Sequence, residues 1–253
     1  MNTRIIAVAN HKGGVGKTTT VASLGSILAA KGRRVLLVDL DAQANLTSSL
    51  APSWEGASIY ESLTGRSKTL PKVRISDNLY LIPASLKLAM VDVELSSAIA
   101  RETILADVLS KERTEEDYDY ILLDGPPSLG LITLNAFTAC TDIIIPLVSE
   151  VLPFMGLTMI SDFIDMVYKR LNPSAHISGI LITRWEGSKL SRNIETKLRD
   201  VLGEKVFETK IRKNIRLAEA PLEGRTIMDY DERSNGARDY ALFAEEFIKK
   251  MED

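Results

Sequence analysis

The sequence predicts an α/β protein built on a doubly wound, mostly parallel sheet with helices on both faces. A glycine-rich stretch lies between an apolar run, residues 5–9, and a segment with apolar residues at helical spacing, residues 18–30. Two further apolar runs, residues 35–41 and 118–124, end in aspartate. Strand and helix signals alternate along the chain and only 6% of residues are aromatic, which favours a parallel sheet covered by helices.

Length and composition indicate one domain over residues 1–253. A chain of 253 residues with 45% hydrophobic content can bury one large core. The sequence has no stretch of eighteen apolar residues, and its first predicted strand begins near the N-terminus, so we expect no signal peptide and a cytoplasmic location. The single cysteine, Cys140, fits a reducing compartment and excludes an intrachain disulfide or a multi-cysteine metal cluster.

Residues 8–20, Val-Ala-Asn-His-Lys-Gly-Gly-Val-Gly-Lys-Thr-Thr-Thr, have the composition and flanks of a phosphate-binding loop. Glycines let the backbone bend sharply and turn several N–H groups toward one point, near the positive end of the following helix dipole. The general motif Gly-x-x-x-x-Gly-Lys-Ser/Thr assigns phosphate contact to Lys17 and a Mg²⁺ ligand to Thr18. The candidate binding residues are Lys12, Gly13, Gly14, Val15, Gly16, Lys17, Thr18 and Thr19.

The loop departs from that motif, because His11 stands where the first glycine belongs and Lys12 precedes the paired glycines. Lys-Gly-Gly-x-Gly-Lys-Thr resembles the deviant Walker A loop of the ParA/MinD family of P-loop ATPases. The resemblance implies that the chain binds ATP and Mg²⁺ and that Lys12 crosses a dimer interface to the partner's nucleotide, acting in catalysis with Lys17. The alternative is a glycine turn with two solvated lysines, which the strand and helix flanks disfavour.

The apolar run of residues 35–41 ends in two carboxylates, Asp39 and Asp41. Carboxylates at the carboxyl end of a parallel strand lie at the ligand crevice of a doubly wound sheet. Asp-Leu-Asp-Ala-Gln-Ala-Asn is similar to the family's Asp-x-Asp-Pro-Gln-Gly-Asn, which implies that Asp41 orients the attacking water and acts on the metal through water. Ala42 and Ala44 depart from the family pattern. The alternative is that both aspartates only cap the following turn.

The other aspartate-terminated run, Tyr-Asp-Tyr-Ile-Leu-Leu-Asp at residues 118–124, ends in Asp124 and looks like a Walker B strand. Asp124 would accept a hydrogen bond from a Mg²⁺-bound water or from Thr18. Gly125 replaces the family's threonine or cysteine before the paired prolines. The alternative role for Asp124 is turn formation.

The remaining elements are predicted from periodicity and breakers, and residues 46–118 are assigned to scaffold. We expect Met155, Met159 and Met166 to fill the core. The predicted helices cover residues 59–63, 86–109 (one or two, broken near 101), 129–140, 154–171, 188–202 and 236–251, and the predicted strands cover residues 78–82, 142–148, 177–183 and 207–211.

Charge is uneven: the net charge is −3, but residues 184–225 hold eleven Lys/Arg against seven Asp/Glu. The run of residues 212–221, Arg-Lys-Asn-Ile-Arg-Leu-Ala-Glu-Ala-Pro, resembles the ParA/Soj segment Ile-Pro-Arg-Asn-Val-Arg-Leu-Ser-Glu-Ala-Pro. The resemblance implies that Asn214 faces the adenine and that Arg216, with Lys189 and Arg192, faces DNA phosphates. The alternative is that these cations are ordinary solvated charges.

The whole pattern resembles a ParA/Soj-type partition ATPase. The resemblance implies a homodimer formed with ATP, nonspecific DNA binding, nucleoid association in the ATP state, and slow hydrolysis stimulated by a ParB-like partner. One alternative is a MinD-like ATPase that acts on a membrane or protein surface; the acidic C-terminal helix disfavours a membrane, because from residue 239 onward there are two lysines against five acids. Another is a nucleotide-gated binding module with negligible turnover.

Overall fold

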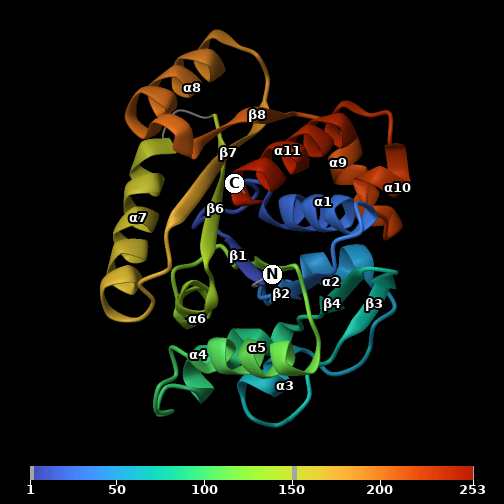
Figure 1. The fold of residues 1–253 in the computed structure, drawn as a ribbon, viewed down its shortest axis with the longest axis vertical. Coiled ribbons are helices and arrows are strands. Elements are labelled where there is room, and N and C mark those ends of the chain that lie inside the picture. Colours follow the sequence, from blue (N-terminus) through green and yellow to red (C-terminus); the bar gives the residue numbers. More distant parts are fainter. Residues whose placement is uncertain (1–2, 150–152, 253) are drawn as a thin grey trace.

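The computed structural model describes residues 3–149 and 153–252, without the side chains of residues 153–155. Its strands form one sheet in the order β3-β4-β2-β5-β1-β6-β7-β8 (Figure 1). Neighbouring strands are parallel except for β3 and β4, so the predicted fold class is confirmed. The strands are β1 (Arg4–Val8), β2 (Val35–Asp39), β3 (Val73–Ser76), β4 (Leu79–Ile82), β5 (Tyr120–Asp124), β6 (Asp142–Val148), β7 (Ile177–Trp185) and β8 (Val206–Arg212).

Helices cover both faces of the sheet. In Figure 1, α1 and α11 lie together on one side, and α5, α6 and α7 lie along the other. The α-helices are α1 (Lys17–Ala30), α2 (Asn45–Leu50), α3 (Ile59–Leu63), α4 (Val91–Glu94), α5 (Ile104–Glu115), α6 (Leu131–Ala139), α7 (Pro153–Arg170), α8 (Lys189–Leu202), α9 (Arg216–Glu219), α10 (Ile227–Asp231) and α11 (Asn235–Glu252). Short 3₁₀ turns are η1 (Leu86–Met90), η2 (Gly203–Lys205) and η3 (Ala220–Glu223).

The strand side chains alternate between two cores, as strand geometry requires. In β1, Ile5 and Ala7 join the core beneath α5, α6 and α7, whereas Ile6 and Val8 join the core beneath α1 and α11. Strands buried on both faces are typical of parallel sheets, which explains their nearly continuous apolar sequences.

Some predicted elements were wrong. Residues 86–109 form η1, the single-turn α4 and only the first half of α5, which begins at Ile104. The short elements α2, β3, α9 and α10 were not predicted. Two of the methionines expected in the core, Met159 and Met166, are 55% and 42% exposed, and the side chain of Met155 lies outside the described residues.

The sheet order brings the three motif-bearing strands together. β5 lies between β1 and β2, with Asp124 in register with Val8 on one side and Asp39 on the other. The loop after β1 and both aspartate-terminated strands therefore meet at one edge of the sheet. Across the described part of the chain, we find no helix that is both long and apolar enough to cross a bilayer.

Candidate nucleotide-binding site

The loop between β1 and α1 has the backbone of a phosphate cradle. Gly14 and Gly16 have φ of 71° and 89°, in the left-handed region that favours glycine. Asn10 anchors the loop: its side-chain amide donates to the Pro146 carbonyl at 2.8 Å, and its Oδ1 accepts from the Lys12 N–H at 3.0 Å. The loop is therefore held to β6 while its glycines turn into α1.

His11, the residue that departs from the general motif, packs against α7. A Cβ at Gly156 would lie 2.2 Å from His11 Cε1, so the imidazole occupies space that only glycine leaves. Burial, with the charges of Lys12 and Lys17, lowers the His11 pKa. The departure thus packs the loop against α7 through the His11 ring.

Lys17 lies at the first turn of α1 and is 7% exposed. Its Nζ donates to the Lys12 carbonyl at 3.1 Å, inside the curve of the loop. Burial lowers the pKa of Lys17, while the charges of Asp124 and Asp41 oppose that shift. A buried ammonium with one neutral acceptor is suited to an anionic ligand.

Asp39 and Asp41 have different surroundings. Asp39 is fully buried and accepts from the Thr47 N–H at 2.8 Å, the Thr47 hydroxyl at 2.7 Å and the Asp41 N–H at 3.2 Å. Burial raises the pKa of Asp39 to about 6 against these hydrogen bonds. Asp41 is half-buried and lines the cavity described below, although its Oδ1 also accepts from the Gln43 N–H at 3.0 Å. Asp39 therefore holds the turn into α2, and Asp41 is the carboxylate available to a ligand.

Asp124 is a buried carboxylate whose oxygens make no well-formed hydrogen bond within the described parts of the chain, although the Thr18 hydroxyl approaches it. Burial, followed by the charge of Asp39, raises its pKa well above the usual range, and neighbouring Thr18 and Lys17 oppose that shift. Mg²⁺ is usually held by one or two carboxylates together with substrate phosphates and water. A buried carboxylate beside a threonine hydroxyl at a helix N-terminus fits that ion.

A cavity of about 540 Å³ joins the loop to a distant segment, within the size range of small-molecule sites. It includes most of the predicted site residues. Lys12 and Val15 belong to the same loop but do not line the cavity, and Asp124 lies buried at the sheet edge. The predicted residues that line it are Gly13, Gly14, Gly16, Lys17, Thr18, Thr19, Asp41 and Asn214.

The segment before α9 forms the second wall of the cavity. Ile215, Leu217 and Ala218 line it next to Asn214. The Asn214 Oδ1 accepts from the Arg216 N–H at 2.8 Å, which leaves the amide N–H groups as donors. Arg212, which replaces the family's proline, is held by Asp239 of α11 through its backbone N–H at 2.9 Å and its guanidinium at 2.6 Å.

Sequence reasoning missed the other lining residues, among them Pro127, Thr183, Arg184 and Tyr240. The Thr183 hydroxyl donates to the Val15 carbonyl at 2.8 Å, and the Tyr240 hydroxyl lies 3.0 Å from the Thr20 hydroxyl. These residues come from other elements, and no local motif marks them. The paired prolines offered a weak signal for Pro127.

The three predicted DNA-contacting residues do not form one patch. Lys189 and Arg192 are exposed in the first turn of α8, whereas Arg216 begins α9, and Figure 1 shows these helices well apart. Arg216 is also engaged, with Glu219 at 2.8 Å and Asp231 at 3.4 Å.

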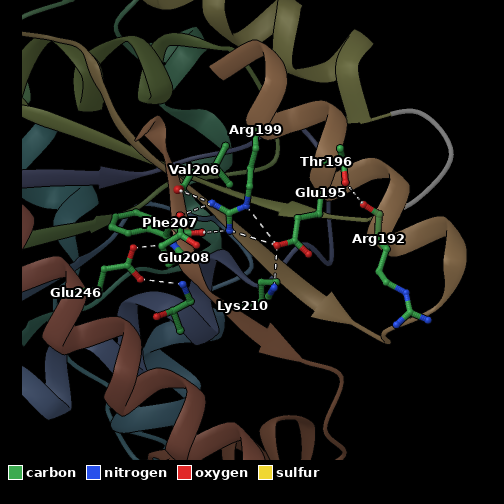
Figure 2. Close-up of polar contacts among 10 residues, drawn as sticks. Arg192, Glu195, Thr196, Arg199, Val206, Phe207, Glu208, Lys210 and Glu246 are labelled. Atoms are coloured by element: carbon green, nitrogen blue, oxygen red, sulfur yellow. Dashed lines mark hydrogen bonds and ion pairs between the residues drawn. The ribbon is translucent and has the colours of Figure 1, made fainter. Parts of the chain in front are cut away.

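Several other cations of residues 184–225 are neutralised within the fold. Figure 2 shows Arg199 and Lys210 converging on Glu195, at 3.3 and 2.7 Å, while Arg199 also pairs with Glu208 at 2.8 Å. We call these four residues the α8–β8 charge cluster. The guanidinium of Arg192 points away from it (Figure 2). The α8–β8 charge cluster is therefore neutral, so the excess of cations in residues 184–225 lies outside it, and part of that excess is paired with acids from beyond this range, as Arg212 is with Asp239.

The chain is similar to known proteins over its full length. A family model described as an AAA domain matches residues 3–177. The chain is 40% identical over 248 residues to the sporulation initiation inhibitor protein Soj of Bacillus subtilis, covering 96% of this chain and 97% of that protein. It is 41% identical over 251 residues to the chromosome-partitioning ATPase Soj of Thermus thermophilus, covering 99% and 97%. It superimposes on cobyrinic acid a,c-diamide synthase from Mycobacterium smegmatis with bound ADP and magnesium, at a TM-score of 0.85, 35% identity, and coverage of 100% and 96%.

The parallel sheet, the glycine loop opening α1 and the carboxylates at the ends of β2 and β5 define a P-loop ATPase whose ligands are ATP and Mg²⁺. Within that class, full-length similarity places the chain in one branch. It belongs to the ParA/Soj family of partition ATPases.

Proposed function

We propose that this ATPase dimerises with ATP and binds DNA without sequence preference. It releases the DNA after ATP hydrolysis, which a ParB-like partner stimulates, and this cycle partitions a chromosome or plasmid. The names of its relatives support the partition role. In the cell it would be a cytoplasmic protein that associates with the nucleoid in its ATP state.

The observation that supports the proposal most strongly is that a single cavity extends from the phosphate loop to the segment that contains Arg216. The same hollow is lined by the phosphate loop and by Asn214, Ile215 and Leu217, and Arg216 lies within that segment. A nucleotide that spans the cavity would contact the backbone that positions Arg216. Its occupancy could therefore shift Arg216 from its ion pairs toward DNA phosphates.

The residue roles follow from the surroundings of each group. The buried Lys17 ammonium would neutralise the β- and γ-phosphates, and the N–H groups of Gly13 to Thr19 would bind their oxygens. Asp41, the aspartate that lines the cavity, would orient the attacking water. Thr18 and Asp124 would hold Mg²⁺, which when bound spreads the charge of the transferring phosphoryl group.

Lys12 is exposed at the outer edge of the loop. Its backbone N–H donates to Asn10 Oδ1 at 3.0 Å and its carbonyl accepts from Lys17 Nζ at 3.1 Å, which fixes the position from which the side chain starts. We propose that it reaches the nucleotide of the second subunit, which makes catalysis depend on dimerisation.

The test is binding to a duplex of arbitrary sequence with ATP, with ADP and without nucleotide, at low and moderate salt. Wild type should bind with ATP only and lose affinity steeply with salt. Arg216→Ala should weaken binding, while Lys205→Ala, which removes an exposed cation at the opposite end of β8, should not.

Binding that is the same in all three nucleotide states would contradict the switch. No DNA binding in any state would contradict the DNA role altogether. Pelleting with anionic vesicles in the presence of ATP would then support a membrane-acting ATPase instead.

A further inference from the structure

Arg184 occupies an unusual place in β7. The pairing of β7 with β8 changes register between Ile182 and Trp185, with one extra residue on β7. Arg184 lies in this irregularity with φ of 50°, a left-handed conformation that a non-glycine residue rarely adopts. Bulges often re-aim a side chain beside an active site, and backbone strain concentrates at ligand contacts.

The residues on either side of Arg184 tie it to both walls of the cavity. The Thr183 hydroxyl donates to the Val15 carbonyl of the phosphate loop at 2.8 Å. On the other side, the Lys213 N–H donates to the Trp185 carbonyl at 3.1 Å, directly before Asn214. Arg184 is thus fixed between the phosphate loop and the segment that precedes α9.

Among the cations that line the cavity, Arg184 differs from the others. Lys17 donates to the Lys12 carbonyl, Arg212 is paired with Asp239, and Lys213 is paired with Glu186 at 2.7 Å. Arg184 is exposed, lines the cavity, and has no ion pair or side-chain hydrogen bond within residues 3–149 and 153–252. Its guanidinium is therefore available to a ligand.

We propose that Arg184 binds the nucleobase end of the nucleotide by stacking its guanidinium on the base. The phosphate loop already supplies Lys17 and its N–H groups to the phosphates, whereas Arg184 is tethered next to the apolar wall of Ile211, Ile215 and Leu217. A planar guanidinium on one side and aliphatic side chains on the other suit an aromatic ring. The proposal rests on the ATP site proposed above and adds a residue to it.

Stacking predicts a specific pattern of selectivity. A guanidinium reads the face of a base, which adenine and guanine share, so Arg184 should support both equally. Asn214, whose amide N–H groups remain as donors, would instead read the edge of the base. The two residues therefore separate affinity from base preference.

The experiment is displacement of a fluorescent ADP analogue by Mg·ADP, Mg·GDP and Mg·pyrophosphate from the full-length chain. Diphosphates avoid ATP-driven dimerisation. Arg184→Gly should weaken both nucleotides by roughly 3- to 30-fold, the range of cation–π contacts, and leave pyrophosphate unchanged. Arg184→Lys, which keeps the charge but not the plane, should fall between, and Lys205→Ala should match wild type.

Arg184→Gly also separates a binding role from a structural one. Glycine adopts φ of 50° without strain, so the melting temperature of the nucleotide-free variant should be unchanged or higher while its ADP affinity falls. A lower melting temperature with unchanged ADP affinity would overturn the proposal. So would an equal loss for pyrophosphate, which would place Arg184 on the phosphates. Failure of wild type to bind ADP would instead refute the nucleotide site itself.

Discussion

Charged side chains have different surroundings in two parts of the molecule: the pocket at the phosphate loop, which contains Lys17 and Asp124, and the basic region of residues 184–225. In the pocket, Asp124 is buried without a well-formed hydrogen bond among the described residues and Lys17 has only a carbonyl, so burial raises the pKa of the first and lowers that of the second. In the α8–β8 charge cluster, by contrast, each cation has a carboxylate within 3.3 Å.

The difference shows where function is to be sought. Uncompensated buried charges are costly and persist where a ligand completes them, whereas exposed pairs contribute little and mainly reduce the charge that a partner meets. The pocket has few charges but leaves them available. The basic region has many, but several are neutralised.

The largest effect should come from Lys17→Ala. The variant removes the buried ammonium that we propose faces the phosphates, and loss of one such stabilising donor typically costs 10²–10³-fold, so we expect ATP hydrolysis to fall at least about 100-fold. Phosphate release measured with partner protein and DNA checks this, with Lys205→Ala as the control. Retention of most of the activity would show that the pocket's uncompensated charge is not used.

Asp124→Asn should stabilise the metal-free protein at pH 8. When folding raises the pKa of a carboxyl, the folded protein binds more protons than the unfolded chain at pH values between the two pKa values. Stability therefore falls as pH rises from the unfolded pKa through the folded pKa, and the ionised carboxylate destabilises the fold. Removing that ionisation should add about 1.4 kcal/mol for each unit of pKa elevation, and about 2–4 °C in Tm per kcal/mol.

Thermal unfolding in the presence of a chelator tests this. The control is Asp41→Asn, at a half-buried site, which should change stability by less than about 0.5 kcal/mol. A lower Tm for Asp124→Asn would mean that the carboxylate is compensated after all.

The metal-free wild-type protein should also lose stability as pH rises from about 4 through about 6, where Asp39 ionises.

Asp239→Asn should lower the free energy of unfolding of the protein by about 1–3 kcal/mol. Asp239 is 5% exposed and accepts from both the backbone and the guanidinium of Arg212, so an amide at this buried position would lose the charge of the pair and set its own N–H donors against those of Arg212. Urea unfolding gives the value. The exposed pair of Arg74 and Asp77 supplies the control, because Asp77→Asn should cost less than about 0.5 kcal/mol.

The smallest effect should come from Glu219→Ala, which frees Arg216 from its 2.8 Å ion pair. If this ion pair limits the contact of Arg216 with DNA, nonspecific DNA affinity in the ATP state should rise by roughly 3-fold in the variant, and the salt dependence of binding should steepen slightly. Fluorescence anisotropy over a salt series measures both. Glu115→Ala makes the same charge change on exposed α5 and should have little effect; equal gains from both variants would reduce the result to net charge.

Much of the fold could be predicted because the apolar runs carry it. β6 was predicted over residues 142–148, and α8 and α11 to within a residue at each end. The misses have a physical reason: α2, Asn-Leu-Thr-Ser-Ser-Leu, is short and polar, and β3, Val-Arg-Ile-Ser, has only two apolar residues. Such segments are ordered by tertiary contacts rather than by their own pattern.

The sequence by itself predicted the contiguous part of the candidate site, since the proposed roles of the glycines, Lys17 and Thr18 depend on local backbone geometry that neighbouring residues specify. The family resemblance already favoured Asp41 over Asp39, but only the tertiary structure shows the physical difference between them, because Thr47 folds back onto Asp39 while Asp41 lines the cavity. The same holds for Arg184, whose place in the cavity comes from a register shift between β7 and β8. Burial and pairing depend on residues far apart in the chain, so a charge is visible in the sequence but its availability is not.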